Sequence, residues 1–167
     1  KDSPLKINDI NIIDNYSPIK KIRDEVKTLL DMTNVILPKN ARLEVSHHYG
    51  IQNFYKYGIT MINIINHSYC KKLIIMLPGQ KHPAQFHKVK EESFFILHGT
   101  ISLTLDKKKF ILKSGDLKTI KKNEVHEFSS KHGAVIEELS TEHIKSDSFY
   151  LDKKIDNNKN RKSFIYL

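Results

Sequence analysis

Side chains that bind divalent metal ions gather in the middle of the chain, between Gly79 and Gly99. Gln85 and His87 are separated by one residue, and Glu92 follows after four more. Because side chains alternate along a strand, Gln85 and His87 are expected on one face, with Glu92 beyond the next bend. Imidazole and carboxylate groups are good ligands for divalent cations, so His87 and Glu92 are candidate ligands.

A second block follows the first. Gly115 is followed by Lys121, Asn123 and His126, and fifteen residues separate Gly99 from Gly115. His126 adds another imidazole, the commonest metal-binding side chain.

Together the two blocks resemble the paired motifs of the cupin family, G-x5-H-x-H-x(3,4)-E-x6-G and G-x5-P-x-G-x2-H-x3-N. The resemblance covers roughly residues 79–130, and the spacings and the interval between the motifs match. It implies an all-β fold, the cupin jelly-roll barrel, in which three histidines and one glutamate hold a divalent metal. Carried over position by position, it assigns the ligand positions to Gln85, His87, Glu92 and His126.

The chain departs from the motifs at several positions. Gln85 replaces the first motif histidine, and a neutral amide oxygen favours harder ions such as Mn²⁺ or Fe²⁺ over Zn²⁺. We expect a divalent metal cofactor, one of Mn, Fe, Ni or Zn. Asn123 replaces a motif glycine, and asparagine tolerates the left-handed conformation that such a turn requires.

Two alternatives to this ligand set stay open. His82 could substitute for Gln85, but its separation from His87 places it on the other strand face unless Pro83 redirects the chain. Otherwise His87 and His126 are ordinary polar residues of a barrel interior, and no metal binds.

A more specific resemblance covers about residues 46–155. The pattern His87-x-x-Lys90-x-Glu92 is similar to that of D-lyxose ketol-isomerases and of the C-terminal cupin modules of N-acetylneuraminate (sialic acid) synthases. The stretches 46–50, 69–73 and 137–143 resemble the same branch. The resemblance implies a barrel that acts on, or holds, a small-molecule sugar.

An aldose–ketose isomerase needs a base beside the metal, and adjacent glutamates offer one. Glu137 and Glu138 lie on a predicted strand, so one faces inward and the other outward. We predict that Glu138 is the inward one, because it shares a face with Ile136, and that it acts as the catalytic base. The alternative is that either glutamate is simply a solvated strand residue. Lys90 is a second catalytic candidate, which would donate to a sugar hydroxyl or steady an enediolate, although a lysine in so lysine-rich a chain can equally be solvated.

Polar and aromatic side chains outside the motifs are candidates for sugar contact. His47, His48 and Tyr49 precede Gly50 in what is either a substrate loop or a plain turn. His143 and Asp147 follow the last predicted strand, where they could close the barrel mouth or cap the C-terminal segment.

Hydrophobic periodicity predicts the elements that position these residues. Ser17-Pro18 and the helical spacing of apolar residues after it predict a helix from Pro18 to about Met32. From Arg42 onward short apolar runs with period two predict eight or more strands, one of them ending at Gly99. We divide the chain into an N-terminal arm and helix (1–40), a β-barrel (41–152) and a basic C-terminal tail (153–167).

Composition excludes several classes of function. The net charge is +9, but only three of the 28 basic residues are arginine, which argues against nucleic-acid binding. No apolar run reaches the roughly 18 residues of a membrane span. Cys70 is the single cysteine, so no internal disulfide forms and a cytoplasmic location is expected. A homodimer is expected from the family resemblance.

Three functions are compatible with these features. The first is a metal-dependent sugar isomerase of the D-lyxose isomerase kind. The second is a non-catalytic sugar-binding or assembly cupin module of a sialic acid synthase-type enzyme. A more distant third is a metal-free cupin epimerase, which would need a histidine base and a tyrosine acid across the barrel.

Overall fold

The computed structural model describes residues 17–167, and the expected N-terminal arm, residues 1–16, lies outside the described residues. The first element is helix α2 (Ser17–Asp31), within one residue of the helix predicted from the sequence. It ends where Thr33 Oγ1 donates to the carbonyl of Leu30. The buried residues of α2 form one stripe that packs on the sheet: Ile19, Ile22, Val26, Leu29 and Leu30.

Eleven strands follow, with three short helices between them. In chain order the elements are β1 (Arg42–His47), η1 (Ile51–Asn53), α3 (Phe54–Tyr57), β2 (Gly58–Asn66), β3 (Tyr69–Met76), β4 (Lys81–Phe86), β5 (Glu92–Leu105), β6 (Lys108–Lys113), β7 (Leu117–Ile120), β8 (His126–Ser129), β9 (Ala134–Thr141), β10 (Phe149–Tyr150), α4 (Lys153–Asn157) and β11 (Lys162–Tyr166).

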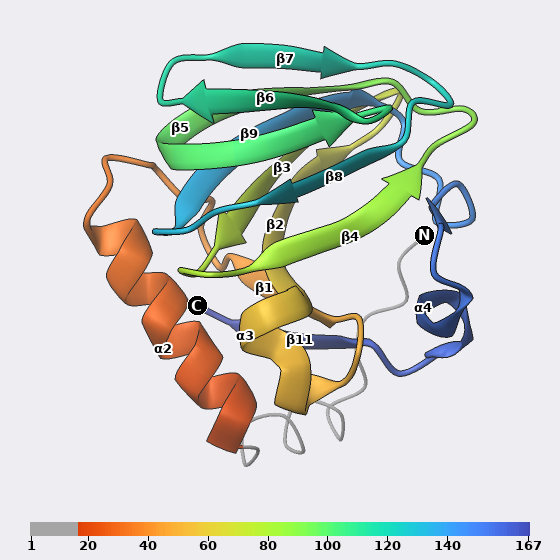
Figure 1. Ribbon diagram of the computed structural model, residues 1–167. Helices are drawn as coiled ribbons and strands as arrows, with labels where there is room; N and C mark the ends of the chain where they lie inside the picture. The colour runs from red at the N-terminus through yellow and green to blue at the C-terminus, as the bar shows by residue number, and fades with distance from the viewer. Residues whose placement is uncertain (1–16) are drawn as a thin grey trace.

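The strands form one curled antiparallel sheet in the order β10-β4-β8-β5-β9-β3-β2-β1-β11, with β6 and β7 also paired to β5 (Figure 1). The N-terminal half of β5 pairs with β7 and β9, and its C-terminal half pairs with β6 and β8. One strand thus belongs to both walls of the barrel. The predicted all-β jelly-roll with an N-terminal helix is confirmed.

The expected strand end at Gly99 is wrong, because β5 runs through this residue. Gly99 has a φ of 80°, and a Cβ there would lie 2.3 Å from the carbonyl oxygen of Gly133. A register shift between Ile96 and His98 on β5 accompanies this close approach. The glycine therefore bends a continuous strand rather than ending it.

Apolar residues form two cores on opposite faces of the sheet. On the outer face, α2 covers residues such as Leu43, Val45 and Ile75. On the inner face, Phe94, Ile96 and their neighbours fill the barrel. This alternation decides which polar side chains of β3, β5 and β9 face the barrel interior.

Strand β4 contains a bulge that changes its alternation. Lys81 pairs with Ser129 and His82 with Phe128, but the next pair is Gln85 with His126, so β4 has one residue more than β8. As a result His82, Gln85 and His87 are all buried. Pro83 lies in the bulge and has no N–H for the ladder, which makes it compatible with this irregularity.

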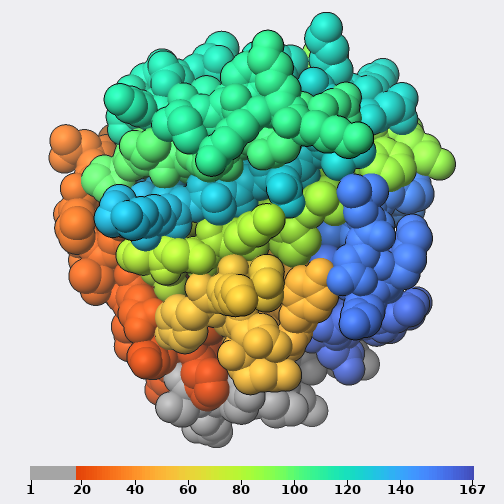
Figure 2. Space-filling model, viewed as in Figure 1, coloured from red at the N-terminus to blue at the C-terminus, as the bar shows by residue number. Residues whose placement is uncertain are grey.

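The region 153–167, expected to be a basic tail, contains α4 and β11. Strand β11 pairs along the whole of its length with β1. In the space-filling view the C-terminal part of the chain, in blue, lies next to β4, in agreement with the pairing of β10 and β4 (Figure 2). Among the described residues, no helix is long and apolar enough to span a membrane.

The packing of α2 gives a stability prediction. Ile22→Ala should lower the free energy of unfolding by about 2–5 kcal/mol, because it leaves a cavity between the helix and the sheet. Lys27→Ala, on the exposed side of α2, should change it by no more than about 0.5 kcal/mol. Denaturant unfolding of both variants measures this, and equal losses would contradict the assigned buried face.

Candidate metal centre

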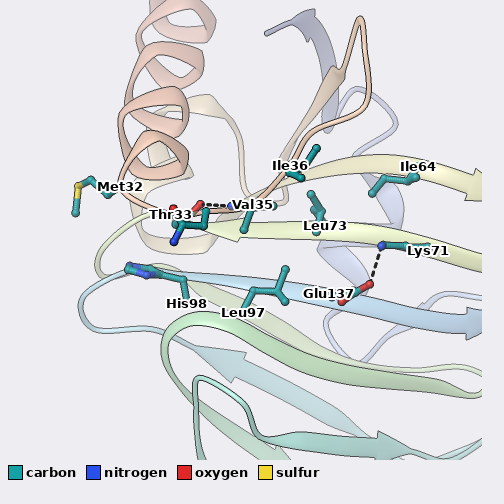
Figure 3. Close-up of a pocket in the computed structure, with 11 residues that line it drawn as sticks. Met32, Thr33, Val35, Ile36, Ile64, Lys71, Leu73, Leu97, His98 and Glu137 are labelled. Carbon is teal, nitrogen blue, oxygen red and sulfur yellow. Dashed lines mark hydrogen bonds and ion pairs between the residues drawn. The ribbon is translucent and has the colours of Figure 1, made fainter.

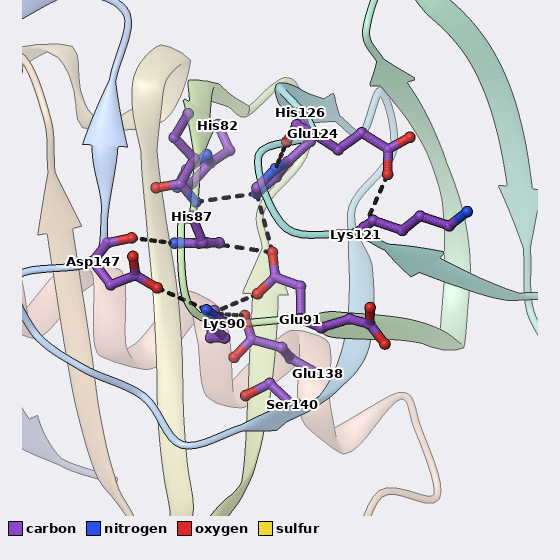
Figure 4. A network of polar contacts seen from close by, with 12 residues as sticks. His82, His87, Lys90, Glu91, Lys121, Glu124, His126, Glu138, Ser140 and Asp147 are labelled. Atoms are coloured by element: carbon purple, nitrogen blue, oxygen red, sulfur yellow. Dashed lines mark hydrogen bonds and ion pairs between the residues drawn. The ribbon is translucent and has the colours of Figure 1, made fainter.

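Three buried side chains from three strand ends converge inside the barrel (Figure 4). His87 follows β4, Glu92 begins β5 and His126 begins β8. Glu92 Oε1 lies 3.0 Å from His126 Nε2 and 3.5 Å from His87 Nε2. One ligand atom from each of the three residues lies within 4.8 Å of the others, which is close enough for a single ion to contact all three.

Backbone contacts determine which nitrogen of each imidazole carries the proton. His87 Nδ1 lies 2.7 Å from the carbonyl oxygen of Asp147, and His126 Nδ1 lies 3.1 Å from that of Glu124. A carbonyl only accepts hydrogen bonds, so both Nδ1 atoms are the donors. In the neutral imidazoles, both Nε2 atoms therefore present lone pairs toward Glu92, which is the tautomer that binds metals.

Several of these inward-facing atoms lack hydrogen bonds. His87 Nε2 and Glu92 Oε1 are buried, and within residues 17–167 neither has a hydrogen-bond partner, whereas Glu92 Oε2 faces the Lys90 ammonium. Leaving such atoms unsatisfied is costly unless a cation compensates them. The geometry fits a divalent metal held by His87, Glu92 and His126.

Gln85, which replaces the first motif histidine, lies beside His126 in the cluster. Its Nε2 lies 3.4 Å from His126 Nε2, a distance that suits donation to the imidazole lone pair. Rotation of the Gln85 amide by half a turn would exchange its oxygen with Nε2 and bring the oxygen to the cluster. Gln85 is thus placed as an optional fourth ligand beside the other three.

The second motif is connected to the first by the backbone. Asn123 has a φ of 65°, which confirms the left-handed turn expected at this motif position. Its N–H donates to the carbonyl of His87 at 2.6 Å. The loop that precedes His126 is therefore held against the residue that supplies the first imidazole.

Lys90 connects the cluster to Glu138. The Lys90 ammonium contacts Glu92 Oε2 and lies 3.4 Å from Glu138 Oε1. Glu92 thus presents Oε1 to the imidazoles and Oε2 to Lys90. A metal ion would be bound by Oε1 alone, because bidentate binding by the carboxylate would need both oxygens. Glu138 Oε2 is buried and, among the described residues, has no hydrogen-bond partner.

The two glutamates have opposite electrostatic environments. Burial favours protonation of Glu92, but the Lys90 ammonium beside Oε2 outweighs it and holds the pKa of Glu92 well below its usual range. Burial raises the pKa of Glu138, and the opposing effect of Lys90 does not reverse the shift because the Glu92 charge acts with burial. Burial lowers the pKa of Lys90, but Glu138 and Glu92 outweigh this effect and raise it, so Lys90 stays charged. Glu92 is therefore the permanent anion, and Glu138 is the group that takes up a proton more readily.

Asp147, after β9, holds the turn that carries His87 and Lys90. Its carboxylate accepts the N–H groups of Lys88, Val89 and Lys90 at 2.8–3.1 Å. Its carbonyl accepts from His87. Sequence reasoning considered Asp147 for closing the barrel mouth or capping the C-terminal segment. No local signal indicates that it contacts a turn 57–60 residues earlier.

A second group of imidazoles lies next to Phe128. His82 stacks on Phe128 with ring centroids 4.8 Å apart, and His48 packs edge-on to His82 at 4.9 Å. His48 Nε2 lies 3.2 Å from the Tyr150 hydroxyl. Burial lowers the pKa of His48 to about 4, so it is a neutral acceptor. His82 does not join the three clustered ligands, although the bulge at Pro83 gives it an inward direction.

The other expected sugar contacts are dispersed. His47 Nε2 lies 3.1 Å from Ser163 Oγ, and Tyr49 donates to Asp152, so neither reaches the cluster. His143 is largely buried, and its pKa is lowered to about 3 by burial and by lysines that include Lys90. His143 therefore lies near the catalytic candidates, whereas His47 and Tyr49 do not.

An open pocket of about 540 Å³ lies on the outer face of the sheet, away from the cluster (Figure 3). It is lined by the end of α2 and by outward-facing side chains of β3 and β9, among them the ion pair of Lys71 and Glu137 at 2.8 Å. The next residues on the same strands, Lys72 and Glu138, face the barrel interior. The expectation that Glu138 is the inward-facing glutamate is thus correct.

Comparison with known proteins agrees with this fold. Residues 72–139 match the family model of the cupin domain. No curated protein matches the chain by sequence. The matched segment, which contains His87, Glu92 and His126, is similar to a cupin domain.

Solved structures with a similar fold include two L-ribose isomerases. A mutant enzyme from Acinetobacter sp. DL28 in complex with L-ribose has a TM-score of 0.71 and 12% identity over 87% of this chain and 96% of that chain. The Cellulomonas parahominis enzyme with L-psicose has a TM-score of 0.67 and 13% identity over 83% and 93%. The cupin domain of Cnp3 from Schizosaccharomyces pombe has a TM-score of 0.48 and 17% identity, covering 51% of this chain and 65% of that chain. At these identities the likeness concerns the fold.

The cluster predicts metal binding by the wild-type protein. His87→Ala should lower the affinity for Mn²⁺ by more than about 100-fold, because changes behind a ligand already cost about 10- to 100-fold. His132→Ala, at an exposed turn, is the control and should bind as the wild type does. Calorimetric titration with MnCl₂ measures both. Wild-type protein that binds no Mn²⁺, Fe²⁺, Ni²⁺ or Zn²⁺ would refute the metal centre.

Asp147 should contribute to the same affinity without touching the ion. Asp147→Ala should weaken Mn²⁺ binding by about 10- to 100-fold, because the turn that carries His87 loses its carboxylate acceptor. Asp116→Ala removes a carboxylate that also accepts a backbone N–H, from Lys113, on an exposed turn away from the site, and should leave the affinity unchanged. Equal effects of the two changes would show that Asp147 acts only through general stability.

Proposed function

We propose that this protein is a metal-dependent sugar isomerase that interconverts an aldose and a ketose, as D-lyxose ketol-isomerases do. The observation that carries the proposal is the arrangement of two imidazole lone pairs and Glu92 beside Glu138, a buried carboxyl group with a raised pKa and an unbonded oxygen. Two proteins of similar fold are L-ribose isomerases, which supports a sugar as the ligand.

Aldose–ketose isomerisation moves a hydrogen between C1 and C2 of the open-chain sugar. In the proton-transfer route a base removes the proton from C2 of the aldose and the electron pair forms the enediolate. The hydroxyl proton passes from O2 to O1, and the base returns to C1 a proton that has exchanged with solvent. A divalent ion bound at the cluster would act as a Lewis acid toward the sugar oxygens. The chain must then supply the base and orient it.

Glu138 has the properties of that base. Its raised pKa increases its affinity for a proton, and a base whose pKa lies nearer the working pH transfers protons more efficiently. Lys90 holds Oε1, which leaves Oε2 to face the substrate. The lysine charge lies beside both carboxylates and would stabilise negative charge that develops on the sugar oxygens.

A second candidate function is a sugar-binding or assembly module without chemistry of its own, as in sialic acid synthase-type enzymes. The observation that favours it is Gln85 in place of the first motif histidine, since this change weakens the donor set. Under this alternative Glu138 would be a hydrogen-bond acceptor for a sugar hydroxyl. The cytoplasmic location and the homodimer stay predictions.

Isotope exchange separates the two functions. Mn²⁺-loaded protein incubated in D₂O with D-lyxose, L-ribose and D-mannose should form the ketose and incorporate deuterium at the carbon that accepts the proton. Glu138→Gln should slow this exchange by about 10²- to 10⁴-fold, the usual contribution of a general base. Proton NMR of the sugars measures both products and label.

The matched control is Glu137→Gln, the neighbouring glutamate on the outer face, which should retain full exchange and bind Mn²⁺ as before. Ketose formation without deuterium would indicate a hydride shift and would remove the base role from Glu138. Sugar binding without exchange or conversion would favour the non-catalytic module.

A further inference from the structure

Lys72 lies on the inner face of the barrel, one strand away from the proposed base. It belongs to β3 and pairs in register with Glu138 of β9. The residue is only 7% exposed, whereas its neighbour Lys71 points outward and pairs with Glu137. A lysine is rarely buried to this degree without a paired carboxylate.

No carboxylate in residues 17–167 lies within ion-pair distance of Lys72. The other lysines of this region are matched: Lys90 contacts Glu92, and Lys162 lies 2.7 Å from Glu44. Glu138, the carboxyl group in register with Lys72, has its hydrogen-bonded oxygen turned toward Lys90. The charge of Lys72 is therefore not balanced by any direct partner in the described part of the chain.

Titratable groups from several elements surround this charge. Lys72 is near enough to help lower the pKa of Glu44 on β1 and to oppose the burial that raises the pKa of Glu138 on β9. It also contributes, after burial, to the lowered pKa of His143, which keeps that imidazole neutral and able to donate or accept a hydrogen bond. Lys72 is thus close to charged groups on β1 and β9, inside the barrel and beside the catalytic candidates.

An additional cation would increase the positive charge here. A divalent ion held at the cluster would add two charges close to Lys90. The Lys72 ammonium has no direct partner, and its nitrogen is not among the fully buried polar atoms of the described residues, so an anionic group of a ligand can reach it and supply the counter-charge.

We propose that Lys72 binds an anionic substituent of the sugar, a phosphate ester or a carboxylate, at the end of the molecule remote from the carbonyl. The substrate class of the proposed isomerase is then an acidic sugar rather than a neutral one. This inference rests on the proposed function for the orientation of the sugar, with its carbonyl end toward Glu138. The binding of the acidic group depends on Lys72 itself.

A different role for Lys72 would be to tune Glu138 electrostatically. In that case removing the charge would alter the rate for neutral and acidic sugars alike. A binding role predicts a loss confined to acidic sugars, so comparison of matched substrates distinguishes the two.

The experiment compares D-mannose, D-mannose 6-phosphate and D-mannuronate, which share C1 to C5 and differ in the charge at C6. Calorimetry with the Mn²⁺-loaded protein measures binding, and deuterium exchange in D₂O measures kcat/KM. The wild type should bind at least one of the acidic sugars about 10- to 100-fold more tightly than D-mannose, the range expected for a charge-assisted hydrogen bond. Which of them is preferred identifies phosphate or carboxylate as the group recognised.

Lys72→Met should remove this preference and leave D-mannose within about threefold, whereas Lys71→Met should change nothing and Lys72→Arg should retain the preference. Circular dichroism and thermal unfolding verify that each variant folds, and the arginine variant keeps the test valid if the methionine variant does not. Equal wild-type binding of all three sugars would overturn the inference. Preferential binding without any exchange would overturn the isomerase proposal and leave the role of Lys72 standing.

Discussion

The burial of the Glu92 carboxylate is the constraint on which the rest of the site depends. A carboxylate removed from water must be compensated, and the Lys90 ammonium lies at one oxygen of Glu92 while the other oxygen faces the two imidazole nitrogens of the candidate metal site. The Lys90 contact keeps the pKa of Glu92 low despite burial and places Lys90 beside Glu138. Lys90 in turn holds one Glu138 oxygen, which leaves the other free. The arrangement of the catalytic candidates thus follows from the need to stabilise one buried anion.

The sheet separates two environments by the simple alternation of side chains. Lys71 and Glu137 form an ion pair on the outer face, next to the pocket at the end of α2. Lys72 and Glu138 are their immediate neighbours, but they lie inside the barrel and do not pair directly. A lysine and a glutamate therefore form a structural ion pair on the outer face, whereas the lysine and glutamate on the inner face are available to bind ligands.

Sequence patterns were sufficient for the features that depend on local spacing. The helix at Ser17–Asp31, the left-handed turn at Asn123 and the convergence of His87, Glu92 and His126 all follow from periodicity or motif spacing. Features that depend on strand pairing were not accessible in this way. The inward direction of His82 requires a bulge whose extra residue is defined only by the partner strand, β8. The continuity of β5 through Gly99 likewise depends on the approach of Gly133 from another part of the chain.

The contact of His87 with Asp147 has a consequence for the order in which the cluster is completed during folding. The carbonyl that holds the His87 ring is sixty residues further along the chain, beyond β5 and β8, which begin at Glu92 and His126. The three clustered side chains are therefore all present in the chain before the segment that orients one of them. Until Asp147 reaches its place against the turn after β4, the His87 imidazole is free to rotate.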